Sequence, residues 1–327
     1  MIITRTPLRM SFVGGGSDMP AYYEKFGGAV VSTAIDKYVF ITVNKKFDDD
    51  IRISYSRTEE VKQVGEIEHS IVRAALNKVG IAGGVEITTI ADIPSSGTGL
   101  GSSSSFTVGL LHALYAYQGK YVSSAQLGEE SCSIEIDICG APIGKQDQYA
   151  AAFGGFNLIR FHQNGTVDVE PMICPLAASQ KLEENILMLY TGRTRSANNI
   201  LSEQSKKSAS SKTVQETLHK MVAQTIDFAK AMQTDDCDAV GEILHEGWQL
   251  KRSLTDGISD SHIDSWYEKG RKAGALGGKI LGAGAGGFLM FYAPKERHAA
   301  IAHALPELRP IPVRFERTGS KVIFYRP

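Results

Sequence analysis

The sequence predicts a globular protein of two domains that combine helices and strands. Its 327 residues suit either two modest domains or one large domain. Apolar residues recur with helical spacing in some segments and with strand spacing in others, which indicates a mixture of the two elements. The composition shifts around residues 175–185. We therefore place a boundary near residue 180 and expect domains at 1–180 and 181–327.

The beginning of the first domain has mainly strand signals. Residues 1–60 are expected to form strands and turns, because β-rich runs occur at 39–43 and 51–55. An amphipathic helix is expected over 67–79, and an alternating strand over 85–90.

The middle of the chain has helical signals around a loop rich in glycine and serine. This loop runs from Pro94 to Ser105 and opens a helix, since apolar residues follow it at helical spacing. A second helix is expected to start at Ser124. Its spacing predicts that Leu127, Ile134 and Ile138 face inward.

The remaining elements are expected in both domains. A short helix that carries Asp147 should end at the glycine pair 154–155, and strands should follow near 156–161 and 167–169. In the second domain, a strand over 186–190 precedes polar helices that fill roughly 196–273. The domain is expected to close with a strand over 288–292, a helix near 295–304 and final strands.

Composition argues against several classes of protein. Hydrophobic residues make up 43% of the chain and charged residues 22%, which is ordinary for a globular protein and unlike a disordered one. The formal net charge is -1 and no stretch is polybasic, so we expect no nucleic-acid or membrane partner. The four cysteines lack zinc-site spacing. The N-terminus lacks the apolar stretch of a signal peptide, so cytoplasm is the expected location.

The glycine- and serine-rich loop suits a phosphate group. Glycines allow the backbone to turn tightly and approach a ligand, and a helix N-terminus offers unpaired N–H groups. A purely structural turn is the alternative. The loop is not a Walker A motif, because the chain contains no GxxxxGK[ST] pattern. The residues expected to hold a nucleotide are Pro94, Gly97, Thr98, Gly99, Leu100, Gly101, Ser102, Ser103 and Ser104.

Two further segments carry glycines in a pattern that suggests a site. One runs from Thr6 to Asp18 and includes Arg9, and the other runs from Lys279 to Gly287. The second segment satisfies GxGxxG, but a strand-like run follows it instead of the helix that a dinucleotide site requires. A structural glycine hairpin is the remaining alternative for that segment.

Taken together, the three segments resemble the three motifs of the GHMP kinases, and they occur in the same order. Gly99-Leu100-Gly101-Ser102-Ser103 is similar to the family's nucleotide phosphate loop. Arg9 and Asp18 take the register of the galactokinase motif, although Gly15-Gly16 replaces a Glu-His pair. The resemblance implies a two-domain α+β fold. The N-terminal domain would be like the second domain of ribosomal protein S5, the C-terminal domain would be ferredoxin-like, and the site would lie between them.

The resemblance also implies chemistry with ATP and Mg²⁺. Asp147 matches the family's catalytic aspartate, and Arg9 would place a positive charge near Asp147 and the transferred phosphate. Glu135 matches the magnesium-binding glutamate, with Asp137 as a competitor. Ser103 is our choice for the second metal ligand, with Ser102 and Ser104 as alternatives.

The implied substrate is a sugar, and segments such as Pro142–Tyr149 look most like the members that act on heptose phosphates. We expect phosphorylation at the anomeric hydroxyl of D-glycero-D-manno-heptose 7-phosphate, for nucleotide-activated heptose and surface glycan synthesis. An unphosphorylated sugar such as fucose or galactose is the alternative, and a non-catalytic sugar- and ATP-binding regulator is another. A homodimer is possible by analogy. The expected substrate contacts are Asp18, Gly16, Ser17, Gly284 and two arginines for the substrate phosphate, Arg193 and Arg195, with Lys279 as a further option.

Overall fold

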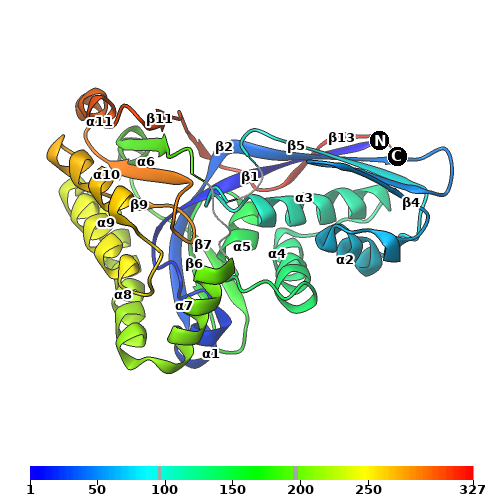
Figure 1. The fold of residues 1–327 in the computed structure, drawn as a ribbon, viewed down its shortest axis with the longest axis horizontal. Coiled ribbons are helices and arrows are strands. Elements are labelled where there is room, and N and C mark those ends of the chain that lie inside the picture. Colours follow the sequence, from blue (N-terminus) through cyan, green and yellow to red (C-terminus); the bar gives the residue numbers. More distant parts are fainter. Residues whose placement is uncertain (95–96, 194–197, 327) are drawn as a thin grey trace.

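The computed structural model describes residues 1–94, 97–193 and 198–326, and these residues form two sheets with helices packed around them (Figure 1). The strands of the first sheet are β1 (Ile2–Val13), β2 (Gly28–Lys45), β3 (Ile51–Ser54), β4 (Thr58–Val61), β5 (Val85–Ala91), β6 (Phe156–Phe161), β7 (Val167–Pro171), β12 (Phe315–Glu316) and β13 (Lys321–Tyr325). Their order is β13-β1-β2-β5-β3-β4, with β6 and β12 also paired to β2, and β7 to β6.

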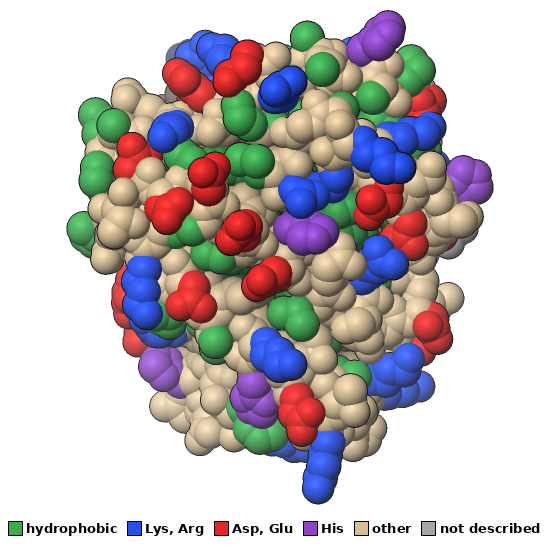
Figure 2. All heavy atoms as spheres, turned by 90° about the vertical axis from the view of Figure 1, so that its left-hand side faces the viewer, with side chains coloured by type: hydrophobic (Ala, Val, Ile, Leu, Met, Phe, Trp, Pro, Cys, Tyr) green, Lys and Arg blue, Asp and Glu red, His purple; other side chains and the backbone are tan. Residues whose placement is uncertain are grey.

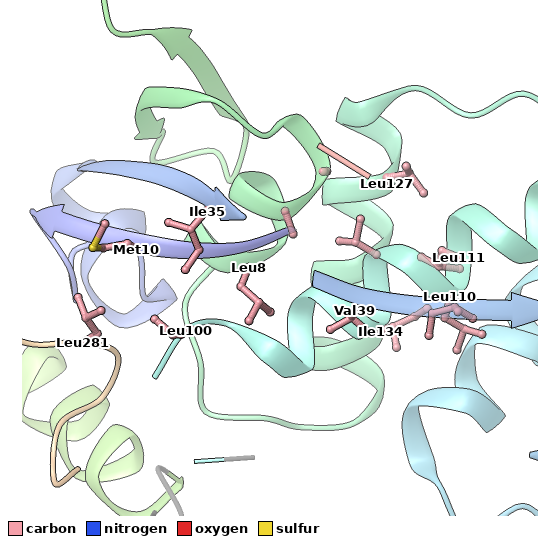
Figure 3. Close-up of a cluster of buried hydrophobic side chains, with 14 of the residues drawn as sticks. Leu8, Met10, Ile35, Val39, Leu100, Leu110, Leu111, Leu127, Ile134 and Leu281 are labelled. Atoms are coloured by element: carbon pink, nitrogen blue, oxygen red, sulfur yellow. The ribbon is translucent and has the colours of Figure 1, made fainter. Parts of the chain in front are cut away.

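Helices α3 (Ser102–Tyr117) and α5 (Gln146–Phe153) pack on one face of this sheet, and α2 (Ser70–Val79) and α4 (Ser124–Cys132) pack against α3 (Figure 1). Residues two apart in a strand face the same side of a sheet, so Leu8 and Met10 of β1 point into one core. Leu100, before α3, and Leu281, from the far end of the chain, are fully buried in the same cluster (Figure 3). The core therefore ties the glycine- and serine-rich loop to the last glycine-rich segment.

The second sheet has the order β11-β8-β10-β9, and each neighbouring pair is antiparallel. Its strands are β8 (Ile186–Tyr190), β9 (Gly277–Ile280), β10 (Phe288–Tyr292) and β11 (Arg309–Pro310). Helices connect β8 to β9, and α11 (His298–Ala304) connects β10 to β11. This split βαβ arrangement confirms the expected ferredoxin-like domain. The connecting helices are α7 (Asn198–Ser210), α8 (Lys212–Thr234), α9 (Cys237–Arg252) and α10 (Ser261–Lys272).

The end of the chain crosses back to the first sheet. Strand β13 pairs with β1, and β12 pairs with β2, so both chain termini lie at the same end of the molecule (Figure 1). These last two strands follow residue 180 in the sequence but lie in the first sheet, so a single boundary near residue 180 does not assign them to the right sheet. For the rest of the chain that division stays a proposal.

Two local expectations were wrong. Ile138 was expected to face inward, but its side chain is 58% exposed. The helix begun at Ser124 changes to a wider π-helical turn over Ser133–Ile138, which rotates Ile138, the last residue of this turn, away from the expected face. Residues 1–60 also contain a helix, α1 (Pro20–Phe26), which begins at a proline that suits a first helical turn.

The chain also forms 3₁₀ turns at Val64–Glu66 and Lys295–Arg297, and helix α6 (Leu176–Glu184) precedes β8. In the part of the chain that the structure describes, no helix has both the length and the apolar character that a bilayer crossing requires.

Figure 2 shows acidic and basic side chains interspersed on the face at the left of Figure 1, where α8 to α11 lie, with no large area of one charge.

Candidate active site

The glycine- and serine-rich loop ends at the N-terminus of α3. Gly101 precedes the helix with a left-handed φ of 75°, and Gly97 and Gly99 also have positive φ. This backbone leads directly to the free N–H groups of the first turn of α3, which suit an anion. Of the helix-opening serines, Ser103 is exposed and Ser104 is buried.

Other residues of the loop have supporting positions. Thr98 is buried and its hydroxyl lies 3.1 Å from that of Ser102. The Leu100 side chain is in the core, and its carbonyl accepts from the Arg9 backbone N–H. Pro94 is exposed just before the two residues that lie outside the described chain.

The loop packs directly against the C-terminal glycine segment. A Cβ at Gly99 would lie 2.2 Å from the Leu281 carbonyl oxygen, and one at Gly282 would lie 2.3 Å from the Gly99 Cα. A Cβ at Gly287 would meet the Thr98 carbonyl oxygen at 2.3 Å. Only glycine allows such close backbone approach, so the glycines of the two segments bring the two domains together at this point.

Arg9 and Asp147 form a two-pronged ion pair beside this loop. The Arg9 Nε and Nη2 donate to the two Asp147 carboxylate oxygens, both at 2.7 Å. Arg9 Nη1 donates to the Gly99 carbonyl at 2.6 Å. The Asp147 carboxylate is partly exposed, whereas Arg9 is buried. A Cβ on Gly101 would come within 3.2 Å of Asp147 Oδ2, so the aspartate lies directly against the start of α3.

Glu135 and Ser103 meet on the other side of the α3 N-terminus. The Ser103 hydroxyl donates to Glu135 Oε1 at 2.8 Å, and Gln148 Nε2 donates to Oε2 at 2.6 Å. The π-helical turn points Glu135 inward, where it is 1% exposed, while Asp137 is exposed. Burial raises the pKa of Glu135, and the hydrogen bonds oppose this rise.

These groups fit Mg²⁺. Within the described chain, Glu135 has no basic side chain within ion-pair distance, so it is a buried carboxylate without a counter-charge. Carboxylate and hydroxyl oxygens are ligands that Mg²⁺ accepts, and it usually takes only one or two carboxylates together with phosphate oxygens. No cluster of three or more acidic, histidine or cysteine side chains suited to a metal occurs among the described residues.

A pocket lined by residues from both domains adjoins Asp147. The N-terminal domain supplies the residues around Arg9 and Asp18, and the segment after β9 supplies Gly282 and Ala283. Helices α7 and α9 close it from the C-terminal domain. The lining residues are Arg9, Ser11, Gly15, Gly16, Asp18, Met19, Ile143, Gly144, Gln146, Asp147, Leu201, Gln204, Lys251, Gly282 and Ala283.

Asp18 is fixed by backbone donors in this pocket. Its Oδ1 accepts from the Gly16 N–H at 2.9 Å, and its Oδ2 accepts from the Gln146 N–H at 3.3 Å. Gly144 has to be glycine there, since a Cβ would lie 2.0 Å from Asp18 Oδ2. Burial raises the pKa of Asp18, and the negative charge of Asp147 raises it further.

Several buried polar atoms of the pocket lack a protein partner. The Ser11 hydroxyl and the Gln146 side-chain oxygen make no hydrogen bond within the described residues. Gln204 of α7 is 3% exposed and its side-chain nitrogen comes close to Gly16. Buried polar groups normally find partners, so these groups are suited to the hydroxyls of a bound sugar.

Other residues expected to contact the substrate lie outside this lining. The Ser17 hydroxyl is fully buried and bonded to the backbone of Gly14 and Ala29. Gly284 packs against Ile258, whose carbonyl oxygen a Cβ would approach to 2.5 Å. The Arg193 guanidinium pairs with Asp260 at 2.9 Å.

Of the two arginines expected to bind the substrate phosphate, the structure describes only Arg193. Arg195 lies outside the described residues. The Arg193 carbonyl accepts from the Gly287 N–H at 2.7 Å, so the backbone of this loop adjoins the glycine segment. Lys279 is buried and its ammonium donates to the Phe12 carbonyl at 2.9 Å.

Sequence reasoning missed Gln204 and Lys251. Both lie on polar helices without a motif. The available signal was position, because Lys251 follows Leu244 and Trp248 at helical spacing and so falls on the apolar face of α9. Lysine is rarely buried, so its occurrence on such a face could have identified Lys251 as a candidate site residue.

The chain matches two family descriptions, GHMP kinases N terminal domain over residues 67–155 and GHMP kinases C terminal over residues 228–310. It is 30% identical over 319 residues to the D-glycero-alpha-D-manno-heptose 7-phosphate kinase of Campylobacter jejuni, a match that covers 93% of each chain. The chain belongs to the GHMP kinase family. GHMP kinases are ATP-dependent phosphotransferases, and this member has the family's two-domain fold.

Two further relatives of this GHMP kinase are informative. A structure described as a D-glycero-D-manno-heptose 1-phosphate kinase from Bacteroides thetaiotaomicron has a TM-score of 0.83, 26% identity, and complete coverage of both chains. The L-fucokinase/L-fucose-1-P guanylyltransferase of Bacteroides fragilis is 27% identical over 91% of this chain, which corresponds to 35% of that longer protein. Sugar kinases are therefore among its relatives.

Proposed function

We propose that this GHMP kinase transfers the γ-phosphoryl group of ATP to the anomeric hydroxyl of D-glycero-D-manno-heptose 7-phosphate, giving ADP and the 1,7-bisphosphate. The observation that carries the proposal is the position of Asp147. It lies against the N-terminus of α3 and also lines the pocket, so one carboxylate faces both a phosphate site and an acceptor site. The name of the Campylobacter jejuni relative supports the choice of sugar.

The nucleotide side uses the loop and the start of α3. The triphosphate would lie over the N–H groups after Gly101, and residues 97–104 would enclose it. Ser103 and Glu135 would hold Mg²⁺, which when bound neutralises part of the charge on the phosphate oxygens. The small side chains here leave the backbone accessible to the phosphates.

The acceptor side uses the pocket. The acceptor oxygen attacks the γ-phosphorus, the bond from that phosphorus to the bridging oxygen breaks, and the electron pair leaves with ADP. Asp147 would take the proton of the acceptor hydroxyl, and Arg9 would balance the negative charge. Asp18 would accept hydrogen bonds from sugar hydroxyls, because it is fixed by the backbone and points into the pocket.

The phosphate already present on the substrate needs a cationic site of its own. Arg193 and Arg195 remain the proposed residues, because a guanidinium suits a phosphate. The bond from the Gly287 N–H to the Arg193 carbonyl places Arg193 beside the glycine segment. The Arg193 guanidinium already pairs with Asp260, at 2.9 Å. An Arg195→Ala variant should raise KM for the heptose phosphate and leave KM for ATP unchanged.

A coupled ADP-release assay tests the proposal. The enzyme is given ATP, Mg²⁺ and one acceptor from a panel of heptose 7-phosphate, mannose, L-fucose and galactose. We expect the highest kcat/KM with heptose 7-phosphate, and phosphorus NMR of the product should show a second phosphate on the anomeric carbon. Faster turnover of an unphosphorylated sugar would refute the substrate assignment, and ATP binding without turnover of any sugar would favour a regulator.

A second candidate acceptor is L-fucose, which the similarity to the Bacteroides fragilis protein favours. The panel distinguishes the two acceptors directly. Because an anomeric phosphate is the group that a nucleotidyltransferase requires, either product would supply the synthesis of a nucleotide-activated sugar.

A further inference from the structure

Lys251 is a buried basic residue in the wall of the acceptor pocket. It comes from the last turn of α9, in the C-terminal domain, and is 7% exposed. Its ammonium donates to the Gly282 carbonyl and also lines the pocket. An ammonium has three N–H donors, so this contact leaves two of them available to a ligand.

The Lys251 ammonium has no ion-pair partner. Within the described residues, no carboxylate oxygen lies within 4.0 Å of it. A buried charge without a partner is costly, so a buried lysine in the wall of a pocket is a candidate for a functional role. The charged groups that act on it are Arg9, Asp18, Asp147 and Lys279, which come from β1, the segment after β1, α5 and β9.

Contacts link this ammonium to the reacting groups. The backbone of Gly282, which accepts from Lys251, packs on the backbone of Gly99. The Gly99 carbonyl in turn accepts from Arg9, which holds Asp147. All three guanidinium nitrogens of Arg9 already donate to protein oxygens, so Lys251 is the more adaptable cation of the two.

We propose that Lys251 is a further catalytic residue, whose ammonium contacts the phosphoryl group in transfer and offsets the charge that develops between ATP and the acceptor oxygen. This charge lies next to the negative Asp147, where a second cation is needed. The step adds no reactant to the proposed transfer. It depends on the proposed function only in that an acceptor is needed for the assay, and any acceptor that the enzyme uses will serve.

The proposed role predicts that the activity falls at alkaline pH. Burial, with the nearby positive charge of Arg9, lowers the pKa of Lys251 to about 8, and the acidic residues Asp18 and Asp147 oppose the shift. Lys251 has to be protonated to act, so kcat/KM should fall as the pH rises through this pKa. The negative charge of bound ATP should raise the pKa of Lys251, so this fall in kcat/KM should occur at a higher pH when ATP is bound.

Two substitutions of Lys251 test the proposal, with a neighbour as control. Lys251→Met removes the charge and keeps the length, Lys251→Arg keeps the charge, and Arg252→Met removes an adjacent charge that pairs with Asp264 at 3.3 Å outside the pocket. The assay measures kcat and kcat/KM against pH with the best acceptor of the panel. Thermal denaturation and binding of ATP are measured for each variant.

We expect Lys251→Met to lower kcat about 100-fold, as the loss of a donor to transition-state charge does elsewhere. Lys251→Arg should restore part of the activity and lose the alkaline fall, because a guanidinium stays protonated. Arg252→Met should keep the wild-type profile.

Either of two results would overturn the role. One is a Lys251→Met kcat within about threefold of wild type. The other is a Lys251→Arg profile that keeps the same alkaline fall as wild type. If Lys251→Met does not fold, the pH profile of Lys251→Arg by itself tests the role of Lys251. A wrong sugar assignment changes the ranking of the panel, but leaves these comparisons between variants on one acceptor unaffected.

Discussion

The proposed nucleotide side and the proposed acceptor side of this GHMP kinase are built in different ways. The nucleotide side is a loop, a helix start and carboxylates that adjacent elements bring together, with the loop glycines between Gly97 and Gly101 fixing the backbone. The acceptor side is a pocket whose far wall comes from α7 and α9. The first depends on backbone shape, whereas the second depends on single side chains such as Gln204 and Lys251. We therefore expect substitutions on the two sides to affect different kinetic constants.

The largest effect should come from Asp147→Asn, which touches both sides. Loss of the carboxylate removes the proton acceptor and leaves Arg9 without its partner. We expect kcat to fall by about 10³ while ATP affinity changes little. Steady-state kinetics and a nucleotide-binding titration measure the two quantities. Equal loss of both would indicate misfolding or a role in nucleotide binding alone.

A Glu135→Gln substitution should affect the nucleotide side only. We expect kcat at fixed Mg²⁺ to fall about 100-fold, because a carboxylate ligand of the metal is lost. Asp137→Asn is the matched control, since Asp137 is exposed on the same turn. A similar loss in both variants would remove Glu135 from the metal site.

Glu135 also predicts how acid affects the metal requirement. Its pKa is raised above the ordinary 4.5 by burial, and only the ionised form binds Mg²⁺ well. As the pH falls toward the raised pKa, the Mg²⁺ concentration for half-maximal activity should rise. The Glu135→Gln variant should lose this dependence, and an equal pH dependence in both proteins would assign it to another group.

Gly99→Ala tests the backbone contact between the two glycine segments. The left-handed φ costs an alanine about 1 kcal/mol, and here the Cβ would also overlap the Leu281 carbonyl. We expect a lower melting temperature and a clear loss of ATP affinity. Gly140→Ala is the control, because Gly140 has φ of +67° with nothing within 4 Å of its Cβ. If the two variants behave alike, the close approach is unimportant.

The smallest effect should come from Gln204→Ala on the acceptor side. Loss of one neutral hydrogen bond is worth about 0.5–1.5 kcal/mol, so KM for the acceptor should rise roughly 2–10-fold, with little change in KM for ATP. Glu203→Ala, at an exposed position one residue earlier on α7, should leave both constants unchanged. A rise in KM for ATP alone would assign Gln204 to the nucleotide side.

The same contrast explains how much of the site could be predicted from the sequence. The loop and Arg9 lie in glycine-rich segments that the sequence itself marks, whereas Asp147 and Glu135 were assigned through the family resemblance. The structure places Arg9 against Asp147 and Ser103 against Glu135. Gln204 and Lys251 enter through tertiary packing of polar helices. For Lys251 the only sign was a polar residue on an apolar helix face, and Gln204 had no comparable sign.

The fold shows a parallel division. The ferredoxin-like order of the second sheet agreed with the resemblance, although strand β9 (Gly277–Ile280) had no strand signal of its own in the sequence. The return of β13 to pair with β1 depends on contacts across the whole chain, which no local pattern contains. Similarly, the outward turn of Ile138 depends on one widened helical turn, which helical spacing alone does not indicate.

A crystal structure with heptose 7-phosphate and a non-hydrolysable ATP analogue tests the central claim most directly. We predict that the terminal phosphorus lies at the N-terminus of α3 and that the anomeric oxygen lies within hydrogen-bond distance of Asp147, in the pocket between the two domains. A triphosphate bound away from Gly97–Ser104, or a sugar held out of reach of Asp147, would contradict the account.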